Sequence, residues 1–132
     1  MTLRIKSLAP ILIVEEIGPS LGFWVDALGF SLGPVVPDTP PYDFAIVARD
    51  GVEVMLQTLA SAATDTPAAT GGVGTSILYI SVEAIDAVLS ALPDAPVVVP
   101  RRTTFYGADE IFVRAPGGHT VGFAAFAAPI EA

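Results

Sequence analysis

VEEIGPSL at residues 14–21 recurs as VEAIDAVL at residues 82–89, 68 positions later along the chain. Each copy follows an apolar run and opens a stretch with helical spacing. The phrase VVP at residues 35–37 is likewise echoed at residues 98–100. One repeat of about half the chain length predicts two like modules rather than a solenoid, whose units are shorter and more numerous. The alternative is coincidence among common apolar residues. Against it, the order of the expected strands and helices recurs together with the residue identities.

The composition is that of a chain that can bury a sizeable core. Hydrophobic residues make up 52% of the 132 residues, and the mean hydropathy is +0.65. No apolar run approaches the roughly 18 residues of a membrane helix, and the N-terminal residues lack the features of a signal peptide. There is no cysteine, which excludes disulfides, thiolate metal sites and cysteine nucleophiles. We therefore expect one domain, residues 1–132, in a cytoplasmic protein.

Acidic residues outnumber basic ones. The 14 Asp and Glu residues against 6 Lys and Arg residues give a net charge of −8. This balance argues against nucleic-acid binding, which depends on neutralising phosphates with basic side chains. It suits neutral or cationic small ligands better than anionic ones, although an acidic charge also simply keeps a protein soluble.

The first module, about residues 7–59, has the pattern of one strand, one helix and three further strands. The expected elements are a strand at 8–14, a helix ending at Gly29, and strands at 31–36, 42–48 and 52–57. The tripeptide RDG at residues 49–51 is typical of a tight hairpin turn.

The second module, about residues 75–126, repeats this order after a linker at about residues 60–74 that is small, polar and rich in glycine. Its expected elements are a strand at 76–82, a helix at 84–92, and strands at 96–99, 110–114 and 119–125. The expected fold class is α+β, with two βαβββ modules.

Stretches near both ends of the chain carry a family resemblance. Phe23-Trp24 with Leu28-Gly29-Phe30, and YGADEIFVRAPGGH at residues 106–119, resemble the opening module and closing hairpin of the vicinal oxygen chelate superfamily. This superfamily includes glyoxalase I, extradiol dioxygenases and the bleomycin resistance proteins. The resemblance implies paired modules that curl a mostly antiparallel sheet around a ligand cavity, usually in a homodimer. Asp109 replaces the usual Arg and Ala115 the usual Asp of the closing motif.

Enzymes of this superfamily hold a divalent metal at equivalent strand positions of the modules. The resemblance places these positions at Ala9, Met55, Ile77 and Gly122. Their side chains cannot coordinate Zn, Ni, Mn or Fe(II), which need imidazole or carboxylate donors. Gln57, two positions away, could supply one oxygen, which is not enough. We therefore expect neither a metal nor another cofactor.

Strand alternation predicts which side chains line the cavity. The expected ligand-binding residues are Ile11, Phe44, Met55, Gln57, Ile77, Tyr79, Phe105, Tyr106 and Gly122. Apolar walls with a few polar tips are typical of a pocket for an aromatic or amphipathic molecule. Phe105 and Tyr106 precede the last hairpin and could stack on a flat ligand. The alternative is that these side chains fill a core or a dimer interface.

Two further residues are candidates for chemistry. His119, the single histidine, follows a Pro-Gly-Gly turn and alternates away from the expected cavity; we expect it to be structural. Glu53 shares the face of Met55 and is either a solvated residue at the cavity mouth or an acid–base group. No pairing of a nucleophile with a histidine stands out.

These features favour a metal-free, homodimeric protein of the bleomycin-resistance type without catalytic residues. Its partner would be a small organic molecule, hydrophobic, aromatic or cationic, which it would sequester; nucleic acid and membrane are not expected. The alternative is a lyase, isomerase or dioxygenase of the same superfamily, using a metal, or an acid–base catalyst using Glu53. A ligand-free dimerisation module is the third possibility.

Overall fold

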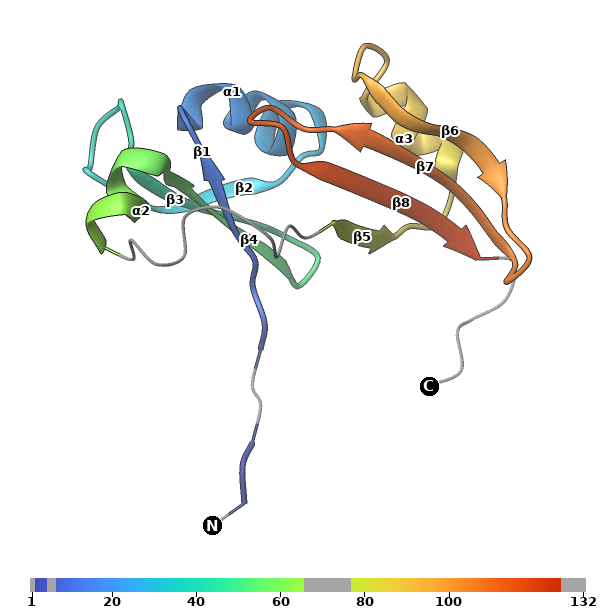
Figure 1. Cartoon of the computed structure of the whole chain (residues 1–132), viewed down its shortest axis with the longest axis horizontal. Helices are drawn as coiled ribbons and strands as arrows, with labels where there is room; N and C mark the ends of the chain where they lie inside the picture. Colours follow the sequence, from blue (N-terminus) through green and yellow to red (C-terminus); the bar gives the residue numbers. More distant parts are fainter. Residues whose placement is uncertain (1, 5–6, 66–76, 127–132) are drawn as a thin grey trace. The chain divides into compact units, whose positions relative to one another are not determined.

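A computed structural model describes residues 2–4, 7–65 and 77–126 (Figure 1). The chain divides into two compact units, Met1–Thr70 and Gly71–Ala132, here called module one and module two and each described by itself. In the described part of the chain, no helix is long and apolar enough to cross a membrane.

The described residues of module one form four strands and three helical segments. They are β1 (Ile11–Val14), α1 (Ile17–Leu21), the π-helical segment η1 (Gly22–Ala27), β2 (Ser31–Val36), β3 (Phe44–Arg49), β4 (Val52–Thr58) and α2 (Leu59–Asp65). The sheet order is β1-β4-β3-β2. β1 runs parallel to β4, and the other neighbours are antiparallel.

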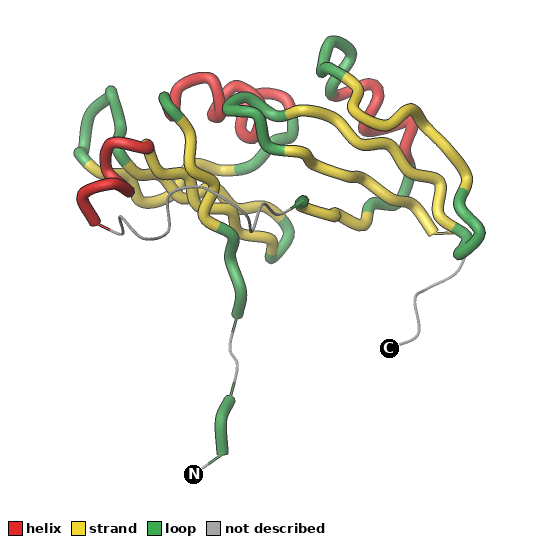
Figure 2. The backbone as a smooth tube through the Cα atoms, viewed as in Figure 1, coloured by secondary structure: helices red, strands yellow, loops and turns green. Residues whose placement is uncertain are grey.

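Module two repeats this arrangement without a counterpart of α2 among its described residues (Figure 2). Its elements are β5 (Leu78–Ser81), α3 (Ile85–Ala91), β6 (Val97–Thr103), β7 (Ala108–Arg114) and β8 (Thr120–Phe126). The order β5-β8-β7-β6 again has one parallel edge pair, β5 with β8. The α+β class and the two βαβββ modules are therefore confirmed. The strands form two open four-stranded mixed sheets, one in each module.

The internal repeat holds at the level of strand register. Ile11 lies opposite Met55 in module one, and Tyr79 lies opposite Gly122 in module two. The offsets are 68 residues for the edge strands (11 to 79) and 67 for the central ones (55 to 122). Met55 and Gly122 thus occupy equivalent places, as the sequence repeat predicts.

Each sheet buries one face under a helix. In module one α1 packs against β4. On the face under α1 the buried apolar strand residues are Leu12, Val14, Ala45, Val47, Val54 and Leu56. In module two α3 packs against β7 and β8. On the face under α3 the buried strand residues are Ile111, Val113, Val121 and Phe123. The alternate residues of each strand point to the opposite face, here called the open face of that module.

The first helix differs from the expected regular α-helix in its second half. Leu28 N–H donates to the Phe23 carbonyl at 3.1 Å, which is the five-residue spacing of a π-turn. Phe23 and Trp24 are both buried and meet edge to face at 5.1 Å. The helix ends, as predicted, at Gly29, which has φ 73°.

The expected linker at 60–74 begins as a helix. α2 is rich in alanine, the best helix former, and Thr58 Oγ1 accepts a hydrogen bond from Ser61 N–H at 3.2 Å, as an N-cap does. The residues of the expected linker from 66 onward lie outside the described residues.

Candidate functional site

The residues expected from module one lie in two neighbouring rows on its open face. Ile11 is opposite Met55, and Phe44 is opposite Gln57. Ile11 is exposed, while Met55 and Phe44 are half-buried. This part of the face is apolar and accessible.

Gln57 does not act as the free polar tip that the sequence suggests. Its side chain is 8% exposed, and its Nε2 donates to Ser61 Oγ of α2 at 3.1 Å. Helix α2 therefore covers this end of the open face and engages the amide. Glu53, the candidate acid–base group, is exposed and lies opposite Ala48 on β3.

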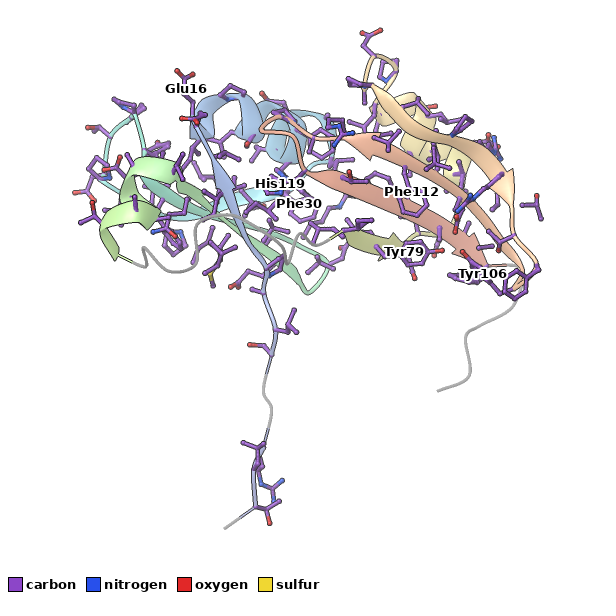
Figure 3. The ribbon with its side chains drawn as sticks, in the orientation of Figure 1. Glu16, Phe30, Tyr79, Tyr106, Phe112 and His119 are labelled. Atoms are coloured by element: carbon purple, nitrogen blue, oxygen red, sulfur yellow. The ribbon has the colours of Figure 1, made fainter. Side chains whose placement is uncertain are left out.

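The open face of module two brings together Tyr79 from β5 and Phe112 from β7 (Figure 3). Gly122 of β8 lies between them, paired with both. Ile77, two residues before Tyr79, is exposed. Tyr106, from the loop between β6 and β7, reaches the same face. The structure therefore groups Tyr79, Tyr106 and Gly122 around residues that were not predicted from the sequence.

Gly122 provides space for an aromatic ring. A Cβ atom built on Gly122 would lie 2.5 Å from Cε2 and 2.8 Å from Cδ2 of Phe112, well inside van der Waals contact. The space over Gly122, expected to be open cavity, is thus filled by the Phe112 ring. The physical reason is that a glycine on a strand leaves a gap that a large neighbour on the adjacent strand can occupy.

Glu110 is the centre of the open face. Its side chain is completely buried, and Oε1 accepts hydrogen bonds from the Tyr79 hydroxyl at 2.6 Å and the Tyr106 hydroxyl at 2.8 Å. Oε2 accepts from Arg102, with Nε at 2.9 Å and Nη2 at 2.8 Å. We call Glu110, Tyr79, Tyr106 and Arg102 the Glu110 cluster.

Small residues on β8 make this cluster possible. Tyr79 is on β5 and Glu110 on β7, so their hydrogen bond crosses over β8, which lies between them. At the crossing, β8 carries Gly122 opposite Tyr79 and Ala124 opposite Glu110. Larger side chains there would hold the hydroxyl and the carboxylate apart.

The cluster keeps Glu110 ionised. Burial opposes the charged form, but the hydrogen bonds from Tyr79, Tyr106 and Arg102 outweigh it, so the pKa of Glu110 lies below its ordinary value. Partial burial and the hydrogen bond to Glu110 raise the pKa of Tyr79 above its ordinary value. Tyr79 therefore stays a neutral hydrogen-bond donor to the carboxylate.

Aromatic rings surround the cluster. Tyr79 lies 5.9 Å from Phe112, measured between ring centroids, and Tyr106 lies 6.4 Å from Phe126. The Arg102 guanidinium lies 5.9 Å from the centre of the Phe112 ring, within the range of a cation–π contact. The open face of module two is thus an aromatic surface organised by one buried carboxylate.

Phe105 and Tyr106 behave differently although they are neighbours. The loop is held by the Thr104 hydroxyl, which accepts from Ala108 N–H at 3.0 Å, and by Gly107 with φ 87°. This turn directs Tyr106 back to Glu110. It leaves Phe105 fully exposed, in edge-to-face contact with Tyr106 at 5.1 Å.

Glu110, Arg102 and Phe112 were not predicted as site residues from the sequence. Strand alternation could have indicated Glu110. It is a charged residue next to the apolar run of β7, and it lies two positions from Phe112, so both side chains point to the same face. The pairing of Arg102 with Glu110 depends on register shifts in β6, which no sequence pattern indicates.

The residues present do not fit the divalent metal of the superfamily's enzymes. Met55 offers only a thioether, and Gly122 has no side chain and is covered by Phe112; Ala9 and Ile77 are aliphatic. Within residues 2–4, 7–65 and 77–126, no group of three or more His, Cys, Asp or Glu side chains could hold a metal ion. His119 belongs to the turn before β8, where its carbonyl accepts from Ala115 N–H at 2.8 Å.

Comparison with known proteins gives a consistent result. Residues 4–123 match the family model of the Glyoxalase/Bleomycin resistance protein/Dioxygenase superfamily. Among solved structures, TioX from Micromonospora sp. ML1 is similar with a TM-score of 0.77 and 20% identity, covering 92% of this chain and 98% of TioX. Lactoylglutathione lyase from Agrobacterium tumefaciens has a TM-score of 0.72 and 14% identity, over 94% and 96% of the two chains. No curated protein matches the sequence. At these identities the structural likeness shows the fold alone.

Proposed function

Because the chain belongs to the Glyoxalase/Bleomycin resistance protein/Dioxygenase superfamily, we propose that it is a metal-free protein that binds and sequesters a planar aromatic compound. The observation that carries this proposal is the open face of module two. There the Phe112 ring fills the position where a metal ligand would stand, and the aromatic side chains around it remain accessible.

The accessible rings support stacking on a flat ligand. Tyr79 is 44% exposed and Tyr106 is 50% exposed, although both hydroxyls are anchored on Glu110. Anchored rings lose little side-chain entropy on binding, so more of the contact energy appears as affinity. Phe105, which is fully exposed, can fold onto a ligand without giving up any packing of its own except its contact with Tyr106.

A catalytic alternative has less support. The metal positions offer no ligand set, and the exposed Glu53 lies across from an alanine. Glu110 is ionised, but it is fully buried behind its partners and engaged on both oxygens. Binding without chemical change is therefore the function that these residues support best.

A thermal-shift screen of chelator-treated protein against planar aromatic compounds tests the proposal. A ligand at about 100 times its dissociation constant should stabilise the fold by about 2.7 kcal/mol, and the compound should be recovered unchanged. Phe105→Ala should weaken binding by about three- to tenfold, the worth of one aromatic contact, while leaving the melting temperature of the free protein unaltered.

Leu8→Ala is the matched control. Leu8 is also highly exposed but belongs to module one. Its replacement should therefore change neither the ligand affinity nor the melting temperature of the free protein. Conversion of the bound compound into a product would contradict sequestration, and failure of every planar compound to stabilise the protein would contradict the choice of ligand class.

A further inference from the structure

The hydroxyl hydrogens of Tyr79 and Tyr106 point at the same atom. Both donate to Oε1 of Glu110, at 2.6 and 2.8 Å. An ionised carboxylate can only accept hydrogen bonds, and a tyrosine hydroxyl has a single hydrogen to give. What each hydroxyl has left to offer is therefore its oxygen lone pairs, which can only accept.

The carboxylate is fixed in this orientation from its other side. Arg102 donates to Oε2 through Nε and Nη2, at 2.9 and 2.8 Å. Arginine has no acceptor atom, so it requires an oxygen facing it and prevents the carboxylate from turning away. Because Arg102 and Glu110 carry opposite charges, their pair adds no net charge to the face.

We propose that Tyr79 and Tyr106 recognise N–H donors on the planar aromatic ligand, and that Glu110 is the positioning residue that fixes both hydroxyls as acceptors. This inference rests on the proposed function and adds the chemical class of the ligand. The site selects an aromatic compound that carries N–H groups over one that carries only acceptors.

Two other observations agree with this selection. The net charge of −8 makes the chain a poor host for acidic aromatics. Glu110 itself is completely buried, whereas Tyr79 and Tyr106 are about half exposed, so a ligand on this face meets the tyrosines rather than the carboxylate. The selection is made by hydrogen-bond polarity, and it applies to neutral aromatic amines as well as to cationic ones.

Carbazole and dibenzofuran are matched probes for this selection. They are neutral, planar and nearly isosteric, and they differ in one ring group, an N–H donor in carbazole and an ether oxygen in dibenzofuran. We expect the unaltered protein to bind carbazole about tenfold more tightly than dibenzofuran in a fluorescence titration. Carbazole gains a hydrogen bond, whereas the ether oxygen of dibenzofuran faces two acceptors.

Glu110→Gln gives a readout that a purely structural role would not produce. The glutamine oxygen must face Arg102, which only donates, so its Nε2 faces the two hydroxyls and donates to them. The hydroxyl hydrogens then turn outward, and the preference should shift from carbazole to dibenzofuran. Tyr79→Phe and Tyr106→Phe keep the rings but remove an acceptor, so each should lower carbazole affinity and should not lower dibenzofuran affinity, because the ether oxygen then faces one acceptor fewer.

The outcomes separate this inference from the function on which it rests. Equal affinity of the unaltered protein for both compounds, or equal losses for both in Glu110→Gln, would overturn the acceptor role and leave aromatic binding standing. The two Tyr→Phe variants decide the question if Glu110→Gln does not fold. Failure of both probes and of every other planar compound to bind would contradict the proposed function, and this inference with it.

Discussion

Glu110 carries a charge with no contact to solvent, and such a residue is costly unless every charged oxygen has a partner. Here Oε1 has two hydroxyl donors and Oε2 has a guanidinium. The arrangement rigidifies the tyrosine rings, and the cost of burial is offset only while these partners are in place. The residue therefore couples the stability of module two to the shape of its open face.

This coupling predicts how stability depends on pH. The pKa of Glu110 is lowered in the folded state, so its contribution is fully present above the unfolded-state pKa of about 4.3 and is lost as the pH falls through the lower folded-state pKa. Glu110→Gln should be less stable than the unaltered protein by about 1–3 kcal/mol at pH 7. Urea denaturation at pH 7 and below pH 4 should show the difference shrinking with acid. A difference that is independent of pH would contradict an ionised Glu110.

Residue-level features of the site were only partly predictable from the sequence. Tyr79, Tyr106 and Gly122 share a face because strand alternation places them there. That Gln57 turns to Ser61, and that Phe112 lies over Gly122, depends on side-chain packing, which alternation does not specify.

At the level of elements, Gly29 illustrates a boundary that the sequence does indicate. Its φ of 73° lies in the left-handed region, and a Cβ there would lie 2.5 Å from Nη1 of Arg49, which donates to the Leu28 carbonyl at 2.7 Å. The helix end and the β3 hairpin are therefore tied together at a position that suits only glycine.

Gly29→Ala should consequently lower the free energy of unfolding by about 1 kcal/mol or more. Gly22→Ala is the matched control, because Gly22 follows α1 directly with helical angles of φ −58° and ψ −42° and has open space around its would-be Cβ. That substitution should stabilise the protein by about 0.5–1 kcal/mol. Chemical denaturation measures the change in the free energy of unfolding of each variant. The same change in both variants would contradict the role assigned to Gly29.

The β7–β8 pair supplies a second test at this scale. Gly122→Ala places a methyl against the Phe112 ring, which should cost about 1–3 kcal/mol through overpacking and weaken ligand binding. Replacing Phe112 by Leu in the same chain should recover part of the loss, because the two residues are in contact. A double variant whose losses simply add would show that Phe112 does not occupy the space over Gly122.

Other elements show where local patterns stop being sufficient. The hairpin at Asp50 and Gly51 follows directly from its sequence, and both residues have positive φ. The π-helical turns of η1 and the start of α2 were not expected. The π-helical turns accompany the burial of two consecutive aromatic residues, Phe23 and Trp24. The start of α2 depends on Thr58, which caps an alanine-rich stretch.

On the scale of the whole molecule, the repeat has kept its backbone while its two open faces have diverged. Module one presents an apolar row with Ile11 and Met55, whereas module two presents the aromatic Glu110 cluster. The repeat is visible in the sequence because equivalent strands of the two modules lie 68 or 67 residues apart and keep the same alternation of apolar residues. The homodimer that the family resemblance implies stays a prediction, which sedimentation analysis tests.

Isothermal titration calorimetry can show whether an aromatic ligand binds without a metal. Chelator-treated protein is titrated first with Zn²⁺, Ni²⁺, Mn²⁺ and Fe²⁺ and then with the best planar ligand, in the presence and absence of each ion. We predict no stoichiometric metal binding and a ligand affinity that is the same with and without metal. One metal bound per chain, with ligand binding only in its presence, would contradict metal-free binding and favour the metal-dependent enzymes of the superfamily.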